Sequence, residues 1–318
     1  MRNYITKNIS EVNINDLLNF YKVAFKSRHP IFFNNFKWFY RMEDSNYEPI
    51  VIFEKGKIVG HAGLIPEFIK FKKKNYKFIW FTDLVVLPEF RKSGFGEQII
   101  KEWMKICENK ITFCNDLSLK IFKKLDWDES SNVSRYIKPL FFHKIYFKKY
   151  LHKKDFKNLK VYKIDDKIIR DILLFEKKNE AQDSAYILRD EKWFEWKFLK
   201  CPFKSDILCF EYDSQYVLAF FDKSNKNKKL KILYTTEKNL QKSKIFKLIQ
   251  IWGGDNKINL IWYISHSNYS GGEIFSFITK KRINFAFKTK DSILKDNLKK
   301  GVLNSQGGDS DIGYLNLL

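Results

Sequence analysis

The residues best suited to chemistry lie together in a short basic stretch that contains two glycines. Arg91, Lys92, Gly94 and Gly96 stand in the order Arg-Lys-Ser-Gly-Phe-Gly, after an apolar segment with a proline and before a segment of helical periodicity. At a helix start the first backbone N–H groups lack partners within the helix and carry partial positive charge. Glycines let a phosphate approach that backbone, and Arg91 and Lys92 add full charges. The stretch therefore predicts a loop that binds a pyrophosphate.

Two common nucleotide-binding signatures do not fit this loop. The Rossmann spacing Gly-x-Gly-x-x-Gly is missing, and no acidic residue closes a second strand at the required distance. A Walker sequence with Gly-Lys-Ser or Gly-Lys-Thr is missing as well. For the bare pattern Arg-x-x-Gly-x-Gly, a structural turn is the alternative to a phosphate loop.

A strand and a helix are expected to position the loop. Residues 79–86 are almost all apolar, which is typical of a strand buried on both faces. Residues 97–110 place their apolar side chains on one helical face. A strand over 111–114 and a helix over 117–124 follow. The loop is thus predicted to join a buried strand to a helix.

A helix and two strand pairs are expected upstream of that strand. Apolar residues recur at helical spacing from Ile14 to Phe25, after a capping residue at Asn13. One strand pair turns at 55–57, and the next turns at 73–75. These elements predict a mixed sheet flanked by helices, an α/β (α+β) fold.

The two halves of the chain resemble each other in their aromatic residues. Three pairs share an offset near half the chain length: Trp38 and Trp196, Phe53 and Phe210, and Trp127 and Phe285, separated by 158, 157 and 158 positions. A constant offset is typical of a duplicated domain, while coincidence in an aromatic-rich β protein is the alternative. We therefore predict two tandem domains, 1–148 and 149–318, with the basic segment near 141–160 as their connection.

Residues 82–101 resemble the acetyl-CoA-binding motif of the GCN5-related N-acetyltransferase (GNAT) family. That motif is similar to hydrophobic-Asp-Leu-x-Val-x-Pro-Glu-x-Arg-x-x-Gly-x-Gly, and this chain reads Thr-Asp-Leu-Val-Val-Leu-Pro-Glu-Phe-Arg-Lys-Ser-Gly-Phe-Gly from Thr82 to Gly96. Downstream, Asn115 follows a predicted strand and precedes a predicted helix, as in the family's second motif. The resemblance covers about residues 1–145.

The resemblance implies that acetyl-CoA is the acyl donor and that the acetyl group passes directly to an amine. The pantetheine is expected to pair with the backbone of Leu84, Val85 and Val86. The other cofactor-binding residues that the resemblance implies are Arg91, Lys92, Ser93, Gly94, Phe95, Gly96, Asn115 and Phe122. The transfer needs a deprotonated amine, a dipole for the developing oxyanion and a proton for the departing thiolate.

The chain departs from the family where the acid is expected. Many members carry a tyrosine general acid where this chain has Phe122, and Asp126-Trp127 replaces the usual Gly-Phe. Asp83 and His61 are the predicted catalytic residues. Asp83 is a carboxylate near the active strand, and His61 lies on the strand expected to border the acceptor cleft. Asp83 could instead cap a turn or pair with a lysine, and His61 could be a structural histidine.

The second half shows no counterpart of the loop. Residues 232–243 contain no glycine pair, and turns are the expected setting of Gly253-Gly254 and Gly271-Gly272. We expect a degenerate domain that is structural or binds the acceptor. The polar tail from Gly301 through Asp309 is expected to be mobile.

Composition restricts the location and the partners. The formal net charge of +22 attracts polyanions without choosing among them. The four cysteines form no CxxC pair and the five histidines lack ligand spacing, so neither a metal site nor a disulfide is expected. No apolar run is long enough to span a membrane and the N-terminus does not read as a secretory signal, which predicts a cytoplasmic protein.

Together these patterns predict an acetyl-CoA-dependent N-acetyltransferase. We expect a small amine as the acceptor, with an amino sugar or sugar nucleotide first, by analogy with acyltransferases that carry tryptophans such as Trp38, Trp193 and Trp196. The alternative is a basic RNA-binding or aminoacyl-tRNA-dependent protein on the same tandem fold. An intact phosphate loop favours the enzyme.

Overall fold

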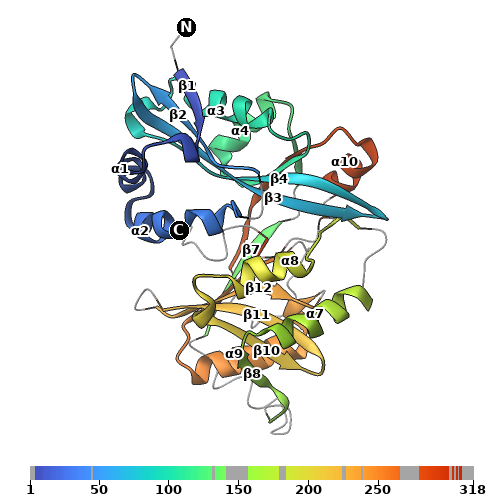
Figure 1. The fold of residues 1–318 in the computed structure, drawn as a ribbon. Helices are drawn as coiled ribbons and strands as arrows, with labels where there is room; N and C mark the ends of the chain where they lie inside the picture. The colour runs from blue at the N-terminus through green and yellow to red at the C-terminus, as the bar shows by residue number, and fades with distance from the viewer. Residues whose placement is uncertain are drawn as a thin grey trace. The chain divides into compact units, whose positions relative to one another are not determined.

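The computed structural model describes two compact units. The described residues are 4–43, 46–130, 133–140, 157–178, 184–223, 227–237, 239–265, 279–300, 303, 306 and 308–309. The first unit is Met1–Ser131 with Asn284–Lys300, and the second is Asn132–Ile283 with Gly301–Leu318. Each contains one mixed sheet with helices packed on it (Figure 1).

The sheet of the first unit has the strand order β1-β2-β3-β4-β5-β15-β6. Only β4 and β5 in this order run parallel, and the other neighbours are antiparallel. Its elements are β1 (Tyr4–Asn8), α1 (Ile14–Phe25), α2 (His29–Phe39), β2 (Ile50–Glu54), β3 (Lys57–Phe71), β4 (Lys74–Val86), α3 (Phe95–Met104), β5 (Lys110–Cys114), α4 (Asp116–Lys124), β6 (Asp128–Ser130), β15 (Asn284–Lys288) and α10 (Ser292–Lys299), with short 3₁₀ turns η1 (Ile9–Glu11), η2 (Lys26–Arg28) and η3 (Pro88–Phe90).

The local sequence accounts for these elements. The Asn13 side chain accepts a hydrogen bond from the Asn15 backbone N–H at 2.9 Å and begins α1, as predicted. Lys55 and Gly56 both have positive φ, 51° and 78°, which suits the tight turn between β2 and β3. Helix α3 ends at Met104, earlier than the predicted residue 110, and by Asn109 the backbone already pairs with β4, where its carbonyl accepts from the Ile79 N–H.

The core of the first unit lies between the sheet and helices α3 and α4. Side chains of β3 alternate between the two faces, so Ala62 and Leu64 join Ile99 and Trp103 of α3 in this core. On the other face, His61 contacts α1 through Tyr21. Figure 1 shows α1 and α2 on the side of the sheet opposite α3 and α4.

The second unit repeats the same plan. Its strand order is β14-β7-β13-β12-β11-β10-β8, in which only β12 and β13 are parallel. Its elements are β7 (Ser134–Pro139), β8 (Lys160–Lys163), α7 (Asp166–Lys178), β9 (Tyr186–Ile187), α8 (Glu191–Phe194), the π-helical η4 (Glu195–Leu199), η5 (Lys204–Asp206), β10 (Ile207–Tyr212), β11 (Gln215–Asp222), β12 (Lys229–Thr235), η6 (Leu240–Lys242), α9 (Lys244–Asp255), β13 (Leu260–Ser265) and β14 (Thr279–Arg282). The predicted fold class, two tandem mixed sheets flanked by helices, is confirmed.

The units differ from the continuous ranges 1–148 and 149–318 that the sequence predicts. After β6, the chain enters the second sheet as β7, and after β14 it returns to the first sheet as β15. Each sheet is therefore completed by a strand from the other half of the sequence. An apolar strand pattern does not encode the sheet in which the strand pairs, so the sequence did not predict this exchange. Most of the predicted connection, 141–156, lies outside the described residues.

Two further expectations for the second half are wrong where the structure describes them. Gly253 and Gly254 lie in the last turn of α9 and not in a separate turn. Gln306 and Asp309 of the tail are 9% and 0% exposed, because Asp309 pairs with a buried arginine. Gly271 and Gly272 lie outside the described residues.

Candidate functional site

Strands β4 and β5 separate at the centre of the first sheet. Their parallel register joins Ile79 to Lys110 and Trp80 to Ile111. The Thr112 hydroxyl then donates to the Phe81 carbonyl at 2.7 Å. Because β4 continues to Val86, its last residues present a backbone edge beyond this register.

A β-bulge shapes that edge. His61 of β3 pairs with Val85 and Gly63 pairs with Thr82, so Asp83 and Leu84 together oppose Ala62. Asp83 has a φ of 49°, a left-handed value that is uncommon for a residue with a side chain. The bulge fixes which backbone groups of β4 face β3 and which face the open edge.

The open edge carries the backbone groups of Leu84 and Val86. The Leu87 N–H donates to the Val59 carbonyl of β3 at 2.9 Å. Backbone groups alternate along a strand, so those of Val86, and of Leu84 two residues earlier, point away from β3. The Arg91 Nε donates to the Val86 carbonyl at 3.1 Å. These groups could pair with an amide-bearing ligand.

The predicted loop joins this edge to the start of α3. Gly94 precedes the helix with a φ of 86°, and a Cβ built on it would meet nothing within 4 Å. The Gln98 N–H donates to the Gly94 carbonyl at 3.0 Å, so the amides just before Gln98 have no helical partner. A Cβ on Gly96 would make ordinary contacts at 3.9 and 4.0 Å. The positive φ of Gly94 therefore favours glycine at that position, whereas Gly96 could be replaced by a residue with a side chain without backbone strain.

The remaining predicted loop residues lie beside the start of α3. Arg91 and Lys92 are exposed, and Ser93 is half-buried. Phe95 is buried, with its ring 6.1 Å from that of Phe90. The structure thus brings the helix start, the glycine and two cations to one place, which is the arrangement that binds phosphate.

Asn115 and Phe122 have structural roles in this arrangement. The Asn115 side chain accepts from the Ser118 N–H at 2.9 Å and caps α4. Phe122 is 1% exposed, and its ring centre lies 4.5 Å from Trp127 and 5.6 Å from Phe81. The structure places Phe122 in the core of the first unit, in the cluster against which Leu84 and Val86 of β4 pack.

Asp83 and His61, the predicted catalytic residues, lie together at the bulge. The Asp83 carboxylate accepts from the Tyr40 hydroxyl at 3.2 Å and lies 3.9 Å from the Arg28 guanidinium. His61 Nδ1 lies 3.2 Å from the Asp83 carbonyl, and a carbonyl only accepts, so this nitrogen donates. The second ring nitrogen, Nε2, then accepts from the Tyr21 hydroxyl at 3.2 Å.

This environment keeps His61 neutral. Its side chain is fully buried, and burial lowers the pKa of His61 to about 4, although the hydrogen bond to the Asp83 carbonyl acts in the opposite direction. Burial and the nearby Asp83 charge also raise the pKa of Tyr21 well above its usual range. With both ring nitrogens bonded to protein, His61 does not contact an acceptor in this arrangement.

Sequence reasoning missed Tyr21, Arg28 and Tyr40. They come from α1, η2 and the end of α2, distant in sequence from Asp83. A signal was present at Gly63, because a Cβ there would lie 2.3 Å from Tyr40 Cε1. The glycine gives the tyrosine ring room to cross β3 and reach the carboxylate.

A comparison with protein families identifies this architecture. Residues 13–127 match the model of the acetyltransferase (GNAT) family. These residues belong to the GNAT family. The match runs from the cap of α1 to Trp127 and includes both the bulge and the loop. The prediction of a GNAT-type acyltransferase is confirmed, and the family is consistent with transfer from an acyl-CoA.

Solved structures share the fold over most of the chain. A GCN5-related N-acetyltransferase from Kribbella flavida has a TM-score of 0.58 at 12% identity, covering 89% of this chain and 70% of its own. A putative acetyltransferase from Pyrococcus horikoshii has a TM-score of 0.59 at 12% identity, covering 95% of both chains. The N-myristoyltransferase of Saccharomyces cerevisiae with bound myristoyl-CoA has a TM-score of 0.55 at 12% identity, covering 91% and 83%. At these identities the likeness shows the fold, and no curated protein matches the chain.

The described residues contain neither a membrane-spanning helix nor a cluster of metal ligands. No helix among them is long and apolar enough to cross a membrane. Within the same residues, no three His, Cys, Asp or Glu side chains are grouped so that they could hold a metal ion.

Proposed function

We propose that the first unit binds acetyl-CoA and transfers its acetyl group to a small amine. The observation that carries this proposal is the bulged, separated end of β4 leading through Gly94 into an uncapped helix start. Leu84, Val85 and Val86 would pair with the pantetheine. The amides from Arg91 to Gly96 would hold the pyrophosphate, with Arg91 and Lys92 supplying charge.

The carboxylate of Asp83 is the proposed proton acceptor for the amine. It lies on the bulge of β4, next to the edge that would hold the thioester, and Tyr40 and Arg28 fix its position. A thioester supplies an activated acyl group, so the chain needs only to orient the amine and take its proton. His61 is proposed as a positioning residue that holds the Asp83 backbone and remains neutral.

The leaving thiolate receives no proton from Phe122. This side chain has no acidic proton and is buried in the core. Water or the substrate ammonium would supply the proton, at little cost in rate if the thiolate departs unprotonated. The rate would then follow deprotonation of the amine.

An amino sugar or sugar nucleotide is the first acceptor class to test. Trp38 is half-buried and retains some surface for stacking on a sugar. Trp193 and Trp196 are 1% and 3% exposed, too little for stacking on a sugar, so they lend no support. The family assignment supports an amine acceptor more generally.

Calorimetric titration with acetyl-CoA tests the proposal. We expect saturation at about one equivalent per chain, because no such loop occurs among the described residues of the second unit. We then expect acetyl transfer in a panel of amino sugars and other small amines. Myristoyl-CoA in a parallel titration tests whether the site prefers a short acyl group. Absence of saturable acetyl-CoA binding would refute the proposed function.

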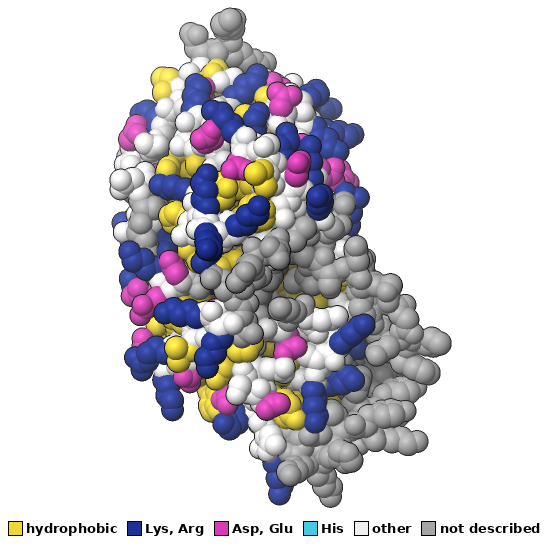
Figure 2. Space-filling model, turned by 90° about the vertical axis from the view of Figure 1, so that its right-hand side faces the viewer, with side chains coloured by type: hydrophobic (Ala, Val, Ile, Leu, Met, Phe, Trp, Pro, Cys, Tyr) yellow, Lys and Arg dark blue, Asp and Glu magenta, His cyan; other side chains and the backbone are white. Residues whose placement is uncertain are grey.

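The net charge of +22 supports a second candidate, the basic RNA-binding or aminoacyl-tRNA-dependent protein. Figure 2 shows Lys and Arg side chains spread over the visible face, with acidic and apolar side chains among them. A short RNA titrated beside acetyl-CoA separates the two. Tight RNA binding without acetyl-CoA binding would favour the second candidate.

A further inference from the structure

The second unit retains the separated strands and the bulge. Strands β12 and β13 run parallel in register from Lys229↔Leu260 to Lys231↔Trp262. Between β11 and β12, Leu218 pairs with Tyr234 and Ala219 pairs with Ile232. Leu233 is therefore an extra residue in β12, at the position that Asp83 and Leu84 hold in β4.

The backbone of β12 beyond this bulge faces the same way as that of β4. The Thr236 N–H donates to the Tyr216 carbonyl of β11 at 3.0 Å, as Leu87 does to Val59 of β3. By alternation the backbone groups of Thr235 and Leu233 point to the edge away from β11. Leu233 and Thr235 thus correspond to Leu84 and Val86, the proposed pantetheine-pairing residues.

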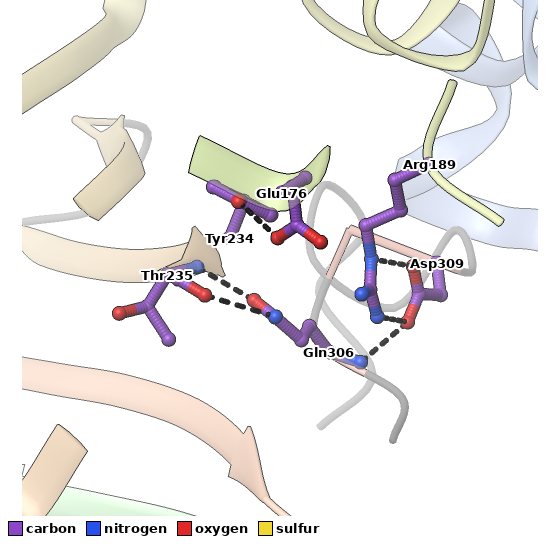
Figure 3. Close-up of polar contacts among 6 residues, drawn as sticks. All are labelled: Glu176, Arg189, Tyr234, Thr235, Gln306 and Asp309. Atoms are coloured by element: carbon purple, nitrogen blue, oxygen red, sulfur yellow. Dashed lines mark hydrogen bonds and ion pairs between the residues drawn. The ribbon is translucent and has the colours of Figure 1, made fainter. Parts of the chain in front are cut away.

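A segment of the chain itself occupies this edge. The name 303–309 segment stands here for its described residues alone, Leu303, Gln306, Gly308 and Asp309. The Gln306 side chain accepts from the Thr235 N–H at 2.6 Å and donates to the Thr235 carbonyl at 3.0 Å, as Figure 3 shows. The Gly308 N–H donates to the Leu233 carbonyl at 2.7 Å. An amide group and a backbone N–H therefore pair with β12 where a pantetheine would pair with β4.

A buried ion pair anchors the 303–309 segment. Arg189 donates from Nε and Nη2 to the two Asp309 oxygens at 2.9 and 2.7 Å, and the side chains are 2% and 0% exposed (Figure 3). The Gln306 N–H donates to the same carboxylate at 2.5 Å. Gly308 has no room for a side chain, since a Cβ would lie 2.9 Å from the Leu233 carbonyl oxygen. The 303–309 segment is therefore held against the second unit by an ion pair, by hydrogen bonds and by a contact that leaves room only for glycine at position 308.

The helix after β12 does not offer a phosphate site. Ser243 caps α9, and its hydroxyl accepts from the Phe246 N–H at 3.3 Å. At α3 the equivalent position is Gly94, which has no side chain to satisfy an amide. The second unit thus keeps the pantetheine-like edge without the loop that would hold a pyrophosphate.

We infer that the 303–309 segment is a built-in ligand of the second unit, bound where its edge would otherwise accept a pantetheine. The inference rests on the proposed function of the first unit, which defines the corresponding edge. It explains why a tandem chain would bind one CoA: the second edge is filled by protein.

The double variant Gln306→Ala/Gly308→Ala of the full chain tests this inference. It removes the two hydrogen bonds of the Gln306 side chain to Thr235 and introduces a methyl group against the Leu233 carbonyl, while the Arg189–Asp309 ion pair is retained. Amide exchange followed by NMR should rise at Thr235 by about 10-fold or more, roughly the factor that one hydrogen bond provides. Exchange at Thr236, which bonds to β11, should stay unchanged and is the internal control.

Pantetheine, which has no pyrophosphate, is the probe for the freed edge. In the wild-type protein we expect it to shift the Val86 amide resonance and leave Thr235 unaffected. In the double variant it should shift both. If Thr235 exchanges freely and pantetheine still leaves it unaffected, the inference is overturned.

A second double variant keeps the inference testable if the first one does not fold. If circular dichroism shows the double variant unfolded, Arg189→Gln/Asp309→Asn loosens the anchor while retaining hydrogen-bonding groups, and the same criteria apply. Failure of the proposed function would look different, because the wild-type Val86 resonance would then respond to neither pantetheine nor acetyl-CoA.

Discussion

The C-terminal ends of β4 and β12 have the same backbone arrangement but differ in the residues at the start of the helix that follows. Both strands carry a bulge, turn an edge toward a diverging parallel neighbour and continue into a helix. At β4 the helix starts at a glycine with open space beside it, whereas at β12 it starts at a capping serine. The same scaffold can therefore hold an external ligand or be closed by its own chain, depending on a few side chains.

The two ends also share an arginine beside a carboxylate. In the first unit, Arg28 lies 3.9 Å from Asp83 of the bulge itself. In the second, Arg189 lies 2.7 Å from Asp309, which comes from the 303–309 segment. In the first pair the charged groups are farther apart and the arginine side chain is partly exposed. In the second pair they are in hydrogen-bond contact and both side chains are buried. This contrast separates a site suited to proton transfer from one suited to stability.

The largest expected effect is on the closed pair. Asp309→Ala removes the carboxylate that forms an ion pair with the buried Arg189, which should lower the free energy of unfolding by about 3–5 kcal/mol. Urea unfolding measures the loss. Asp206→Ala is the matched control, because Asp206 pairs with Lys223 at an exposed site and should cost about 0–1 kcal/mol. Equal losses in the two variants would contradict a special role for the buried anchor.

The neutral histidine predicts a slightly smaller, pH-dependent effect. Burial holds the pKa of His61 at about 4, below its ordinary value of 6.5. Between these values the unfolded chain binds a proton that the folded chain does not, so stability falls as the pH drops, by about 3 kcal/mol over the window. In His61→Gln this contribution should vanish, and urea unfolding at pH 7 and pH 4.5 compares the two proteins. An equally steep loss in the variant would show that other groups cause it.

The loop of the first unit predicts an effect on cofactor binding. Gly94→Glu places a side chain and a negative charge in the proposed pyrophosphate site, at a φ of 86°, and should weaken acetyl-CoA binding by about 10²-fold or more, or about 2.7 kcal/mol. Gly56→Glu is a close control, since Gly56 has a φ of 78° and also meets nothing within 4 Å. Calorimetric acetyl-CoA titrations of both variants distinguish a local effect on the binding site from a general effect of backbone strain. Unchanged affinity in a folded Gly94→Glu protein would remove the loop from the proposal.

The smallest expected effect is that of one loop charge. Arg91→Gln removes an exposed cation that also bonds to the Val86 carbonyl, and should weaken acetyl-CoA binding by about 10-fold or less. The salt dependence of binding should decrease too, because exposed charges are screened. Lys73→Gln, an exposed lysine on the β3–β4 turn, removes the same charge elsewhere and should leave affinity unchanged. Equal losses in both variants would indicate that net charge alone attracts the cofactor.

Features encoded within a few residues could be predicted from the sequence. The cap at Asn13, the turn at Lys55-Gly56 and the loop around Gly94 each depend on local backbone preferences, and the structure contains all three. The motif also placed Asp83 near the end of a central strand. These signals sufficed for the fold class and for the candidate cofactor site.

Features that depend on distant partners could not be predicted in this way. Nothing in the sequence around His61 indicates that Tyr21 and Asp83 will bond to both ring nitrogens, or that burial will keep the ring neutral. Asp309 lies in a polar segment whose composition is typical of a mobile tail, and only its pairing with Arg189 makes it buried. The exchange of β7 and β15 likewise depends on which sheet offers a free edge.

The exchange of strands between the sheets affects how the protein is made. The first sheet contains β15, so its strand order is incomplete until Lys288 has left the ribosome. Domains usually fold as units during synthesis with the N-terminal domain first, but the first sheet of this chain can be completed only after β15 has been synthesised. Its early strands therefore expose an unpaired edge on β5 throughout elongation, which favours chaperone binding and late, concerted folding of both halves.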